Sequence, residues 1–273
     1  MLISLIMATI NRVEEVGTFL ESLKNQTYKE FELILVDQNN DDRLMSFIKK
    51  YSQMYKIIYV KSDCAGLSKN RNIGLNYTNG DIIAFPDDDC EYKNDTLESV
   101  QDFLSNNKYD YFTFAYEDKI SKRRGLKKKK KEIHYNNVFE SAVSITIFAK
   151  RDCFTGFSFD ELLGAGAPFG SSEESDMLFY FLSNKKIGYY NGFYTIYHPI
   201  DNESFNYLRS YNYGLGFGAL HKKIIIQYKR YYYLLRFIFK VMVNIAAIII
   251  SPHKKYYYSG LKGKISGFIK YNK

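Results

Sequence analysis

A short apolar run that ends in three consecutive carboxylates constrains this chain most. Residues 80–90 read GDIIAFPDDDC, so the apolar segment Ile82–Phe85 is followed by Pro86 and then by the acids Asp87–Asp89. Neighbouring carboxylates repel and raise one another's pKa, so the arrangement is costly unless something cationic lies beside them. The compensating group can be a divalent metal, the metal-bound phosphates of a nucleotide or a basic side chain.

Apolar segments alternate along the first ninety residues in the pattern typical of a doubly wound α/β fold. Continuous apolar runs predict strands at 2–8, 31–36, 57–60 and 81–85, and helical spacing predicts helices at 13–23, 43–51 and 66–76. Such all-apolar strands are buried on both faces of a parallel sheet, whose crossovers are helices. Further along, the pattern predicts helices at 97–104 and 177–182 and strands at 109–116 and 144–149.

Polar segments follow three of the predicted strands. They are Thr9–Asn11, Asp37–Asn40 and Asp87–Asp89. Ligands of open parallel sheets bind beyond the carboxyl ends of the strands. We therefore expect one pocket to collect all three segments.

The carboxylates after the fourth strand fit a magnesium or manganese site better than a calcium loop. An EF-hand loop needs Gly at its sixth position, where this chain has Tyr92. A Mg²⁺ or Mn²⁺ site that takes its other ligands from water and a diphosphate needs only one or two carboxylates. The separate acidic cluster Glu173–Asp176 then suggests displacement at a sugar carbon, with a carboxylate deprotonating the acceptor hydroxyl. Acids in a first helical turn are also explained by capping alone.

Composition excludes several other classes of protein. With 273 residues, of which 46% are apolar, the chain is not a disordered polymer. Its net charge of +8 is concentrated at residues 122–131 and in the last fifty residues, which favours metal-bound phosphates or anionic lipid as partners. No nucleic-acid-binding signature accompanies the charge, so we expect no nucleic acid partner.

Cysteine usage and the N-terminal residues predict a cytoplasmic location. Cys64, Cys90 and Cys153 lack CxxC spacing, which argues against a disulfide framework or a zinc site. The chain opens with a strand-like run rather than with the basic and apolar regions of a signal peptide. A reducing compartment follows.

The last fifty residues predict a basic, aromatic and amphipathic extension at 223–273. Within it, Leu234–Ile250 is the most apolar segment, but Arg236, Lys240 and Asn244 recur at i, i+4 and i+8 and share one helix face. A membrane-spanning helix needs about twenty apolar residues without such a stripe. The helix is therefore expected either to lie on the membrane surface or to pack against the domain.

Five motifs in matching order make residues 2–182 resemble the inverting glycosyltransferases of family two, which have the GT-A fold. The motifs are SLIMATINR, FELILVDQNNDD, GLSKNRNIG, DIIAFPDDDC and EESD, and YNYGLGFGALHKK extends the likeness into the part typical of bacterial polysaccharide enzymes. The resemblance implies a GT-A domain at 1–222, with a nucleotide-binding half at 1–95 and an acceptor half at 96–222. The helical, membrane-associated extension at 223–273 would follow it.

The resemblance also implies an activity and its partners. The reaction is inverting, metal-dependent transfer of a sugar from a nucleotide-diphosphate sugar, with a UDP-sugar expected first. The acceptor is a hydroxyl of a glycan or a lipid-linked oligosaccharide, in the synthesis of a bacterial surface polysaccharide. The enzyme would lie peripherally on the inner face of the cell membrane.

Donor-binding residues are implied motif by motif. Ala8, Thr9 and Asn11 would line the base and ribose, and Asp37 would bond the base. Arg71 would face the diphosphate, because a guanidinium pairs well with phosphate oxygens. In the DXD pattern, Asp87 would lie near the ribose and the metal, Asp88 would take the variable middle position, and Asp89 would be the direct ligand. His198 would be a further metal ligand.

The catalytic base of the family belongs to a Glu-Asp pair at a helix start. Here the pair is Glu173-Glu174, so Glu174 stands where Asp is more usual, and Asp176 is its rival. We favour Glu174 on position, because the base must lie within hydrogen-bond reach of the acceptor hydroxyl. Ser172 and Glu173 are expected to contact the acceptor.

Two other functions compete with sugar transfer. A sugar-nucleotide nucleotidyltransferase would share the sheet and the metal carboxylates, but needs a Gly-rich basic loop after its first strand. The segment Thr9–Arg12 contains no glycine. A non-catalytic protein that binds membrane surfaces through its basic patches would show no metal affinity at Asp87–Asp89.

Overall fold

The contacts of this chain divide it into two compact units. The computed structural model describes residues 1–141, 143–200 and 205–272. The first unit comprises residues 1–65, 69–158 and 184–200, and the second comprises residues 66–68, 159–183 and 201–273. The predicted domain boundary between residues 222 and 223 lies inside a single helix, α6 (Tyr207–Ile226).

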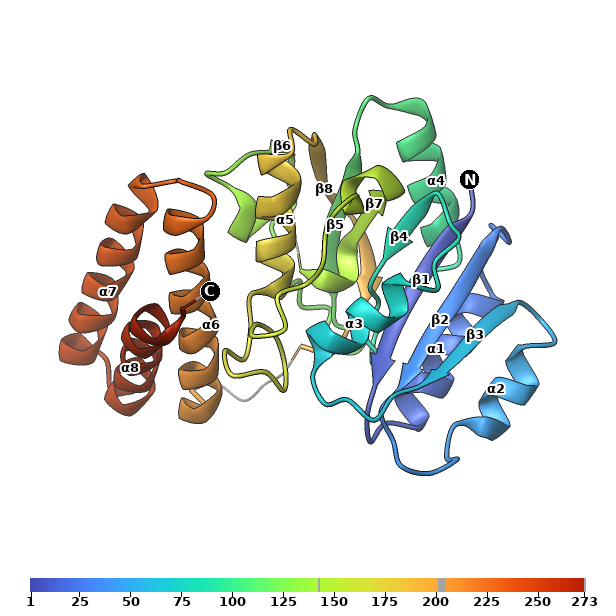
Figure 1. The fold of residues 1–273 in the computed structure, drawn as a ribbon, viewed down its shortest axis with the longest axis horizontal. Helices are drawn as coiled ribbons and strands as arrows, with labels where there is room; N and C mark the ends of the chain where they lie inside the picture. Colours follow the sequence, from blue (N-terminus) through green and yellow to red (C-terminus); the bar gives the residue numbers. More distant parts are fainter. Residues whose placement is uncertain (142, 201–204, 273) are drawn as a thin grey trace. The chain divides into compact units, whose positions relative to one another are not determined.

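The first unit is built on one eight-stranded sheet of order β3-β2-β1-β4-β7-β5-β8-β6 (Figure 1). Strands β1 to β4 are parallel, β7 is antiparallel to both its neighbours, β8 is parallel to β5, and β6 is antiparallel to β8. This arrangement confirms the predicted α/β class. The strands are β1 (Ile3–Thr9), β2 (Phe31–Asp37), β3 (Lys56–Lys61), β4 (Ile82–Ala84), β5 (Tyr111–Glu117), β6 (Lys130–Ile133), β7 (Ile147–Lys150) and β8 (Gly188–Tyr197).

Helices cover both faces of this sheet, and β1 and β2 are therefore buried along almost their whole length. Leu5 and Leu35 point to the face whose core α1 and α4 complete. On the other face, a Cβ added at Gly74 would clash with Ile6 and contact Val36. The helices of this unit are α1 (Glu14–Lys24), α2 (Met45–Tyr51), α3 (Leu67–Leu75, whose first two residues group with the second unit) and α4 (Thr96–Asn106).

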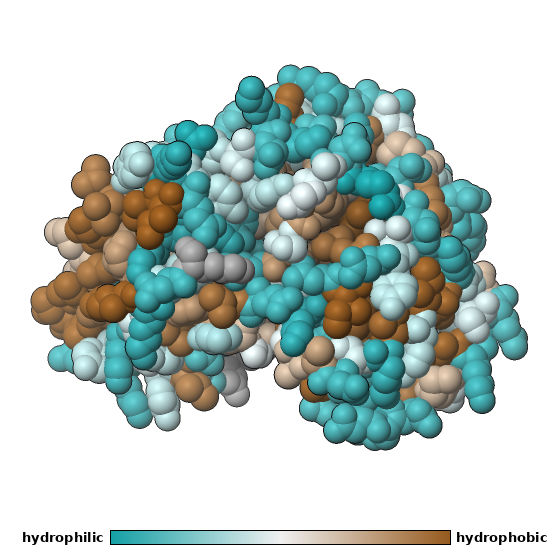
Figure 2. All heavy atoms as spheres, viewed as in Figure 1, coloured by the Kyte–Doolittle hydropathy of each residue, from teal (hydrophilic) through white to brown (hydrophobic). Residues whose placement is uncertain are grey.

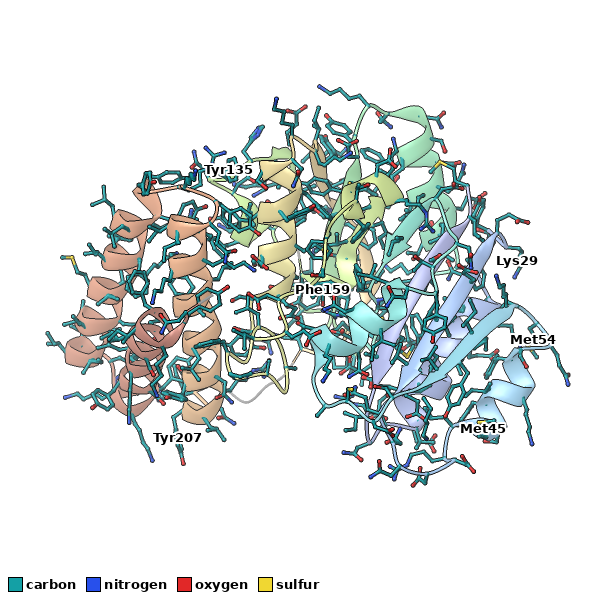
Figure 3. The ribbon with its side chains drawn as sticks, viewed as in Figure 1. Lys29, Met45, Met54, Tyr135, Phe159 and Tyr207 are labelled. Atoms are coloured by element: carbon teal, nitrogen blue, oxygen red, sulfur yellow. The ribbon has the colours of Figure 1, made fainter. Side chains whose placement is uncertain are left out.

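The second unit is helical. Glycines let α6 and α8 approach closely: a Cβ added at Gly214 would lie 2.6 Å from the carbonyl oxygen of Gly260, and one at Gly218 would clash with α8. Both helices carry the small-xxx-small spacing that suits such contacts. Tyr207, labelled in Figure 3, opens α6 and is half exposed. The other helices are α5 (Glu173–Ser183), α7 (Tyr232–Ile250) and α8 (Lys254–Lys270).

Some predicted elements differ from the structure. Residues Ser144–Thr146, predicted as strand, form a 3₁₀ turn before β7, and the basic run at 122–131, predicted as a loop, enters β6 at Lys130. Helix α5 begins four residues before the predicted helix 177–182. Strand β8 and helix α8 were not predicted. The buried side of α8 consists of Gly260, Gly263 and Gly267, which produce no apolar period.

A buried histidine in α6 makes the stability of the fold depend on pH. Burial lowers the pKa of His221 to about 4, against a hydrogen-bonding contact of its Nδ1 with the Phe217 carbonyl oxygen at 2.9 Å. As pH falls, His221 therefore takes up a proton near pH 6.5 in the unfolded chain but only near pH 4 in the folded chain. Urea denaturation should show that the free energy of unfolding falls by about 3 kcal/mol, from this residue alone, as pH decreases through that window.

Two variants separate this effect from the titration of carboxylates. The substitution His221→Gln should flatten the pH dependence, whereas His134→Gln, at an exposed position, should leave it as in the wild type. Equal slopes in His221→Gln and the wild type would contradict the prediction.

Candidate functional site

The first two acids after β4 each contact a side chain from a different element. Arg71 in α3 is 1% exposed, so it is not a surface residue, and its Nη2 lies 2.9 Å from Asp87 Oδ1. At the end of β1, Ala8 is half-buried and Thr9 Oγ1 donates to Asp88 Oδ2 at 2.7 Å. Burial raises the pKa of Asp88 to about 6, although the hydrogen bond from Thr9 opposes the shift. Because β1 and β4 are neighbours in the sheet, the predicted polar segments Thr9–Asn11 and Asp87–Asp89 lie in contact.

The third acid, Asp89, lies between a guanidinium and an imidazole. Arg12 Nη1 lies 3.0 Å from Asp89 Oδ2, and His198 Nε2 lies 3.2 Å from Asp89 Oδ1. Glu91 and Tyr197 exchange two backbone hydrogen bonds of 2.9 Å, which hold His198 beside Asp89. Burial disfavours both charged forms, but their contact raises the pKa of His198 and lowers that of Asp89.

These residues fit a divalent cation of the magnesium and manganese class. Asp87, Asp89 and His198 each offer one ligand atom, and these atoms all lie within 4.8 Å of one another. Carboxylate oxygens and an imidazole nitrogen are ligands that Mn²⁺ accepts, and carboxylates suit Mg²⁺. The structure therefore brings together the predicted metal ligands from β4 and the segment after β8.

A second group of polar residues lies at the ends of β1, β2 and β3. Asn11 has a positive φ of 59° and its backbone N–H donates to Asn39 Oδ1 at 2.7 Å. Asn39 donates twice to Asp37 Oδ1, and Tyr59 and Lys61 donate to Asp37 Oδ2 at 2.8 and 3.2 Å. Asp37 is fully buried, and a carboxylate accepts about four such bonds. Its predicted contact with a nucleobase requires that one of these bonds be exchanged.

In the second unit, a buried ion-pair cluster holds Asp176. Lys223 Nζ donates to Asp176 Oδ2 at 2.7 Å and to Asp160 Oδ2 at 2.9 Å. The hydroxyls of Tyr228 and Tyr271 donate to Asp176 and Asp160 at 2.9 and 2.6 Å. Burial raises the pKa of Asp176, and Lys223 and Tyr228 oppose the shift. The carboxylate of Asp176 is committed to joining α5 with α6.

The other two acids in the first turn of α5 differ in burial. Glu173 is buried, with its Oε2 3.2 Å from a Cβ added at Gly164, whereas Glu174 is half-buried and accepts a 3.4 Å hydrogen bond from Ser175. Ser172, just before this turn, has a positive φ of 80°, a conformation that costs a non-glycine residue free energy. Glu174 is therefore the carboxylate of this turn that reaches solvent.

Sequence analysis missed several residues that support these sites. Arg12 stands in the same polar segment as Thr9, and this position could have revealed it. Lys61 lies opposite Asp37 only because β2 and β3 pair in that register. Lys223 is remote in sequence from both of its acidic partners, and no local pattern links them.

Comparison with known proteins matches the first part of the chain to one family. The model of the family described as glycosyl transferase family 2 matches residues 4–161. The minor teichoic acid biosynthesis protein GgaB of Bacillus subtilis (strain 168) is 28% identical over 201 residues, which cover 67% of this chain and 21% of GgaB. The chain thus spans about a fifth of the length of that relative.

Solved structures share the fold. TarS 1–349 of S. aureus in complex with UDP-GlcNAc has a TM-score of 0.63 at 15% identity, covering 97% of this chain and 91% of that one. The mannosyltransferase PcManGT from Pyrobaculum calidifontis, in complex with GDP-Man and Mn²⁺, has a TM-score of 0.68 at 12% identity, covering 97% and 86%. These likenesses confirm the predicted GT-A fold.

The buried cluster around Lys223 makes a specific prediction about stability. The substitution Lys223→Met leaves Asp160 and Asp176 buried without their shared cation. Urea denaturation should show a loss of about 4 kcal/mol in the free energy of unfolding, because breaking a buried ion pair leaves an uncompensated charge.

The neighbouring lysine provides the control. Lys222 is half-buried and donates to Ile269 and Asn272 near the C-terminus. Its replacement by Met should cost about 1 kcal/mol or less. Equal losses of unfolding free energy in the two variants would show that the buried ion pairs of Lys223 stabilise the fold no more than the surface contacts of Lys222.

Proposed function

This chain belongs to glycosyltransferase family 2, and on that premise we propose that it transfers a sugar, with inversion, from a nucleotide-diphosphate sugar to a hydroxyl of a glycan or lipid-linked oligosaccharide. The observation that carries the proposal is the cluster of Asp87, Asp89 and His198 at the carboxyl ends of the strands. Family membership establishes a glycosyltransferase and argues against both the nucleotidyltransferase and the non-catalytic alternative. UDP-GlcNAc bound to TarS supports a UDP-sugar donor.

Residues of the first unit would bind the donor. Asp87, Asp89 and His198 would hold Mn²⁺ or Mg²⁺, which would supply positive charge to the departing diphosphate. Arg71 would orient the diphosphate, and its present pairing with Asp87 keeps the guanidinium at the strand end. Thr9, with Ala8 and Asn11, would line the base and ribose, and Asp37 would bond the base in exchange for one of its present hydrogen bonds.

Glu174 is the proposed catalytic base. It would take the proton of the acceptor hydroxyl as that oxygen bonds to the anomeric carbon and the bond to the diphosphate breaks, which inverts the configuration. Asp176 is less suited to this role because Lys223 and Tyr228 occupy its oxygens. Ser172 and Glu173, which flank the start of α5, would contact the acceptor. The positive φ of Ser172 supports a functional constraint there.

We propose that the acceptor belongs to a bacterial surface polysaccharide and that the enzyme works at the cytoplasmic face of the membrane. The name of GgaB, a teichoic acid biosynthesis protein, supports the first part. One helix, Tyr232–Ile250, is long and apolar enough to cross a membrane by length and composition, and it is mostly exposed.

Replacement of the proposed base tests the reaction. With Mn²⁺, a glycan acceptor and a panel of nucleotide sugars, Glu174→Gln should lower the rate of nucleoside diphosphate release about 100-fold or more, because the amide cannot accept the proton. Glu161→Gln, at an exposed position in the same unit, is the matched control and should keep the wild-type rate. Full activity of Glu174→Gln would reject Glu174 as the base, and loss of activity only in Asp176→Asn would favour its rival.

Calorimetry tests the metal site without turnover. Mn²⁺ titrated into the chain in the presence of UDP should bind at least about tenfold more weakly to Asp89→Asn and to His198→Gln, because each variant removes a ligand. Asp102→Asn, on the exposed side of α4, should bind as the wild type does. Unchanged affinity in both ligand variants would exclude this cluster as the metal site.

A further inference from the structure

We propose that α7 lies flat in the surface of an anionic bilayer, with its outer face among the lipid headgroups and acyl chains and the cations at both of its ends on lipid phosphates. This deepens the proposed membrane location and rests on it. It does not depend on the transferase chemistry.

The outer face of α7 is apolar along its whole length. Figure 2 shows hydrophobic residues gathered over this helix at the left of the view. Leu235 is 71% exposed and Ile249 is 71% exposed, which is far from the burial that large apolar side chains normally find. The exposed apolar residues of the helix are Leu234, Leu235, Ile238, Phe239, Met242, Val243, Ile245, Ile249 and Ile250.

On its inner side the same helix bonds to α8 through Asn244, whereas Lys240, from the same polar stripe, is exposed. Asn244 Nδ2 donates to the Tyr257 carbonyl oxygen at 3.1 Å, and Lys264 Nζ donates to Asn244 Oδ1 at 2.7 Å. The rings of Phe237 and Phe268 stack with their centroids 4.4 Å apart. Helix α7 therefore packs against α8 by its inner face. Its outer face remains exposed and apolar, as a lipid-binding surface would be.

The positive charge of the C-terminal helices favours an anionic partner. Residues 204–273 contain no Asp or Glu and contain thirteen Lys and Arg residues. Lys229 lies just before α7 and Lys254 and Lys255 lie just after it, all three exposed. Tyr231, just before α7, and Tyr258, in the first turns of α8, are also exposed, as suits headgroup depth. An apolar face between cationic ends complements anionic lipid.

A second copy of the chain is a poorer occupant of this face. A symmetric dimer through α7 would place the same lysines of two copies near one another, and the acid-free sequence offers them no counter-charge. Like charges at such an interface disfavour association.

A spanning orientation is also disfavoured. Because α8 is bonded along the inner side of α7, a crossing α7 would carry Lys262 and Lys264 of α8 into the hydrocarbon. Lysine within a bilayer is costly. An orientation parallel to the surface keeps α8 and its lysines out of the lipid and buries only the apolar face.

Co-sedimentation of the full chain with vesicles tests the proposal. Binding should be strong to phosphatidylcholine vesicles that contain phosphatidylglycerol and weak to pure phosphatidylcholine. Leu235→Glu should weaken binding about tenfold or more. The outer face loses an apolar side chain that the lipid would bury, and it gains an acid that anionic lipid repels. The matched control is Ile120→Glu, which makes the same kind of change at a residue that is 93% exposed in the first unit.

Each other outcome would overturn the proposal. Equal binding to both kinds of vesicle would remove the role of charge, and protein that resists extraction by alkaline carbonate would indicate a spanning helix. A dimer in solution that Leu235→Glu dissociates would assign the face to a second copy. Release of nucleoside diphosphate with a soluble acceptor should be the same in Leu235→Glu and the wild type, so failure of vesicle binding and failure of the proposed reaction can be told apart.

Discussion

Electrostatic repulsion among the three carboxylates after β4 is the constraint on which the first unit depends. The acids occupy adjacent positions of the chain, and each of them contacts a different set of side chains. Three basic side chains lie beside them: Arg12 follows β1, Arg71 is in α3 and His198 follows β8. Strands β1, β4 and β8 run in the same direction within the mixed sheet, so the segments that follow them meet at one edge.

The acidic residues in the first turn of α5 differ in the roles that their surroundings allow. Glu173, Glu174 and Asp176 all suit the positive end of a helix, and on the sequence Glu174 and Asp176 are rival candidates for the base. Burial separates them, because Lys223 draws Asp176 into the helical core and leaves Glu174 half-buried. The structural acid and the proposed catalytic acid thus differ by what another helix places opposite them.

The helical unit illustrates how small residues decide which surfaces remain exposed. Gly214 and Gly260 let α6 and α8 pack closely, and α7 then attaches to this pair by Asn244 and Phe237. With Asn244 and Phe237 on the packed side, the large apolar side chains of α7 such as Leu235 and Ile249 lie exposed. Of the alternatives that the sequence left open, packing against neighbouring helices uses the inner side of α7, and the proposed contact with a membrane would use its outer side.

The sequence by itself determined the α/β alternation, the strand ends that bear polar residues, and the family, because apolar runs and contiguous motifs are local properties. It did not reveal β8, α8 or the support of Asp37 by Tyr59 and Lys61, since these depend on pairing between segments remote in sequence. It also could not rank Glu174 above Asp176 beyond their position. Tertiary structure adds the pairing of Asp176 with Lys223, because the burial and pairing of a carboxylate are set by the helices that pack around it.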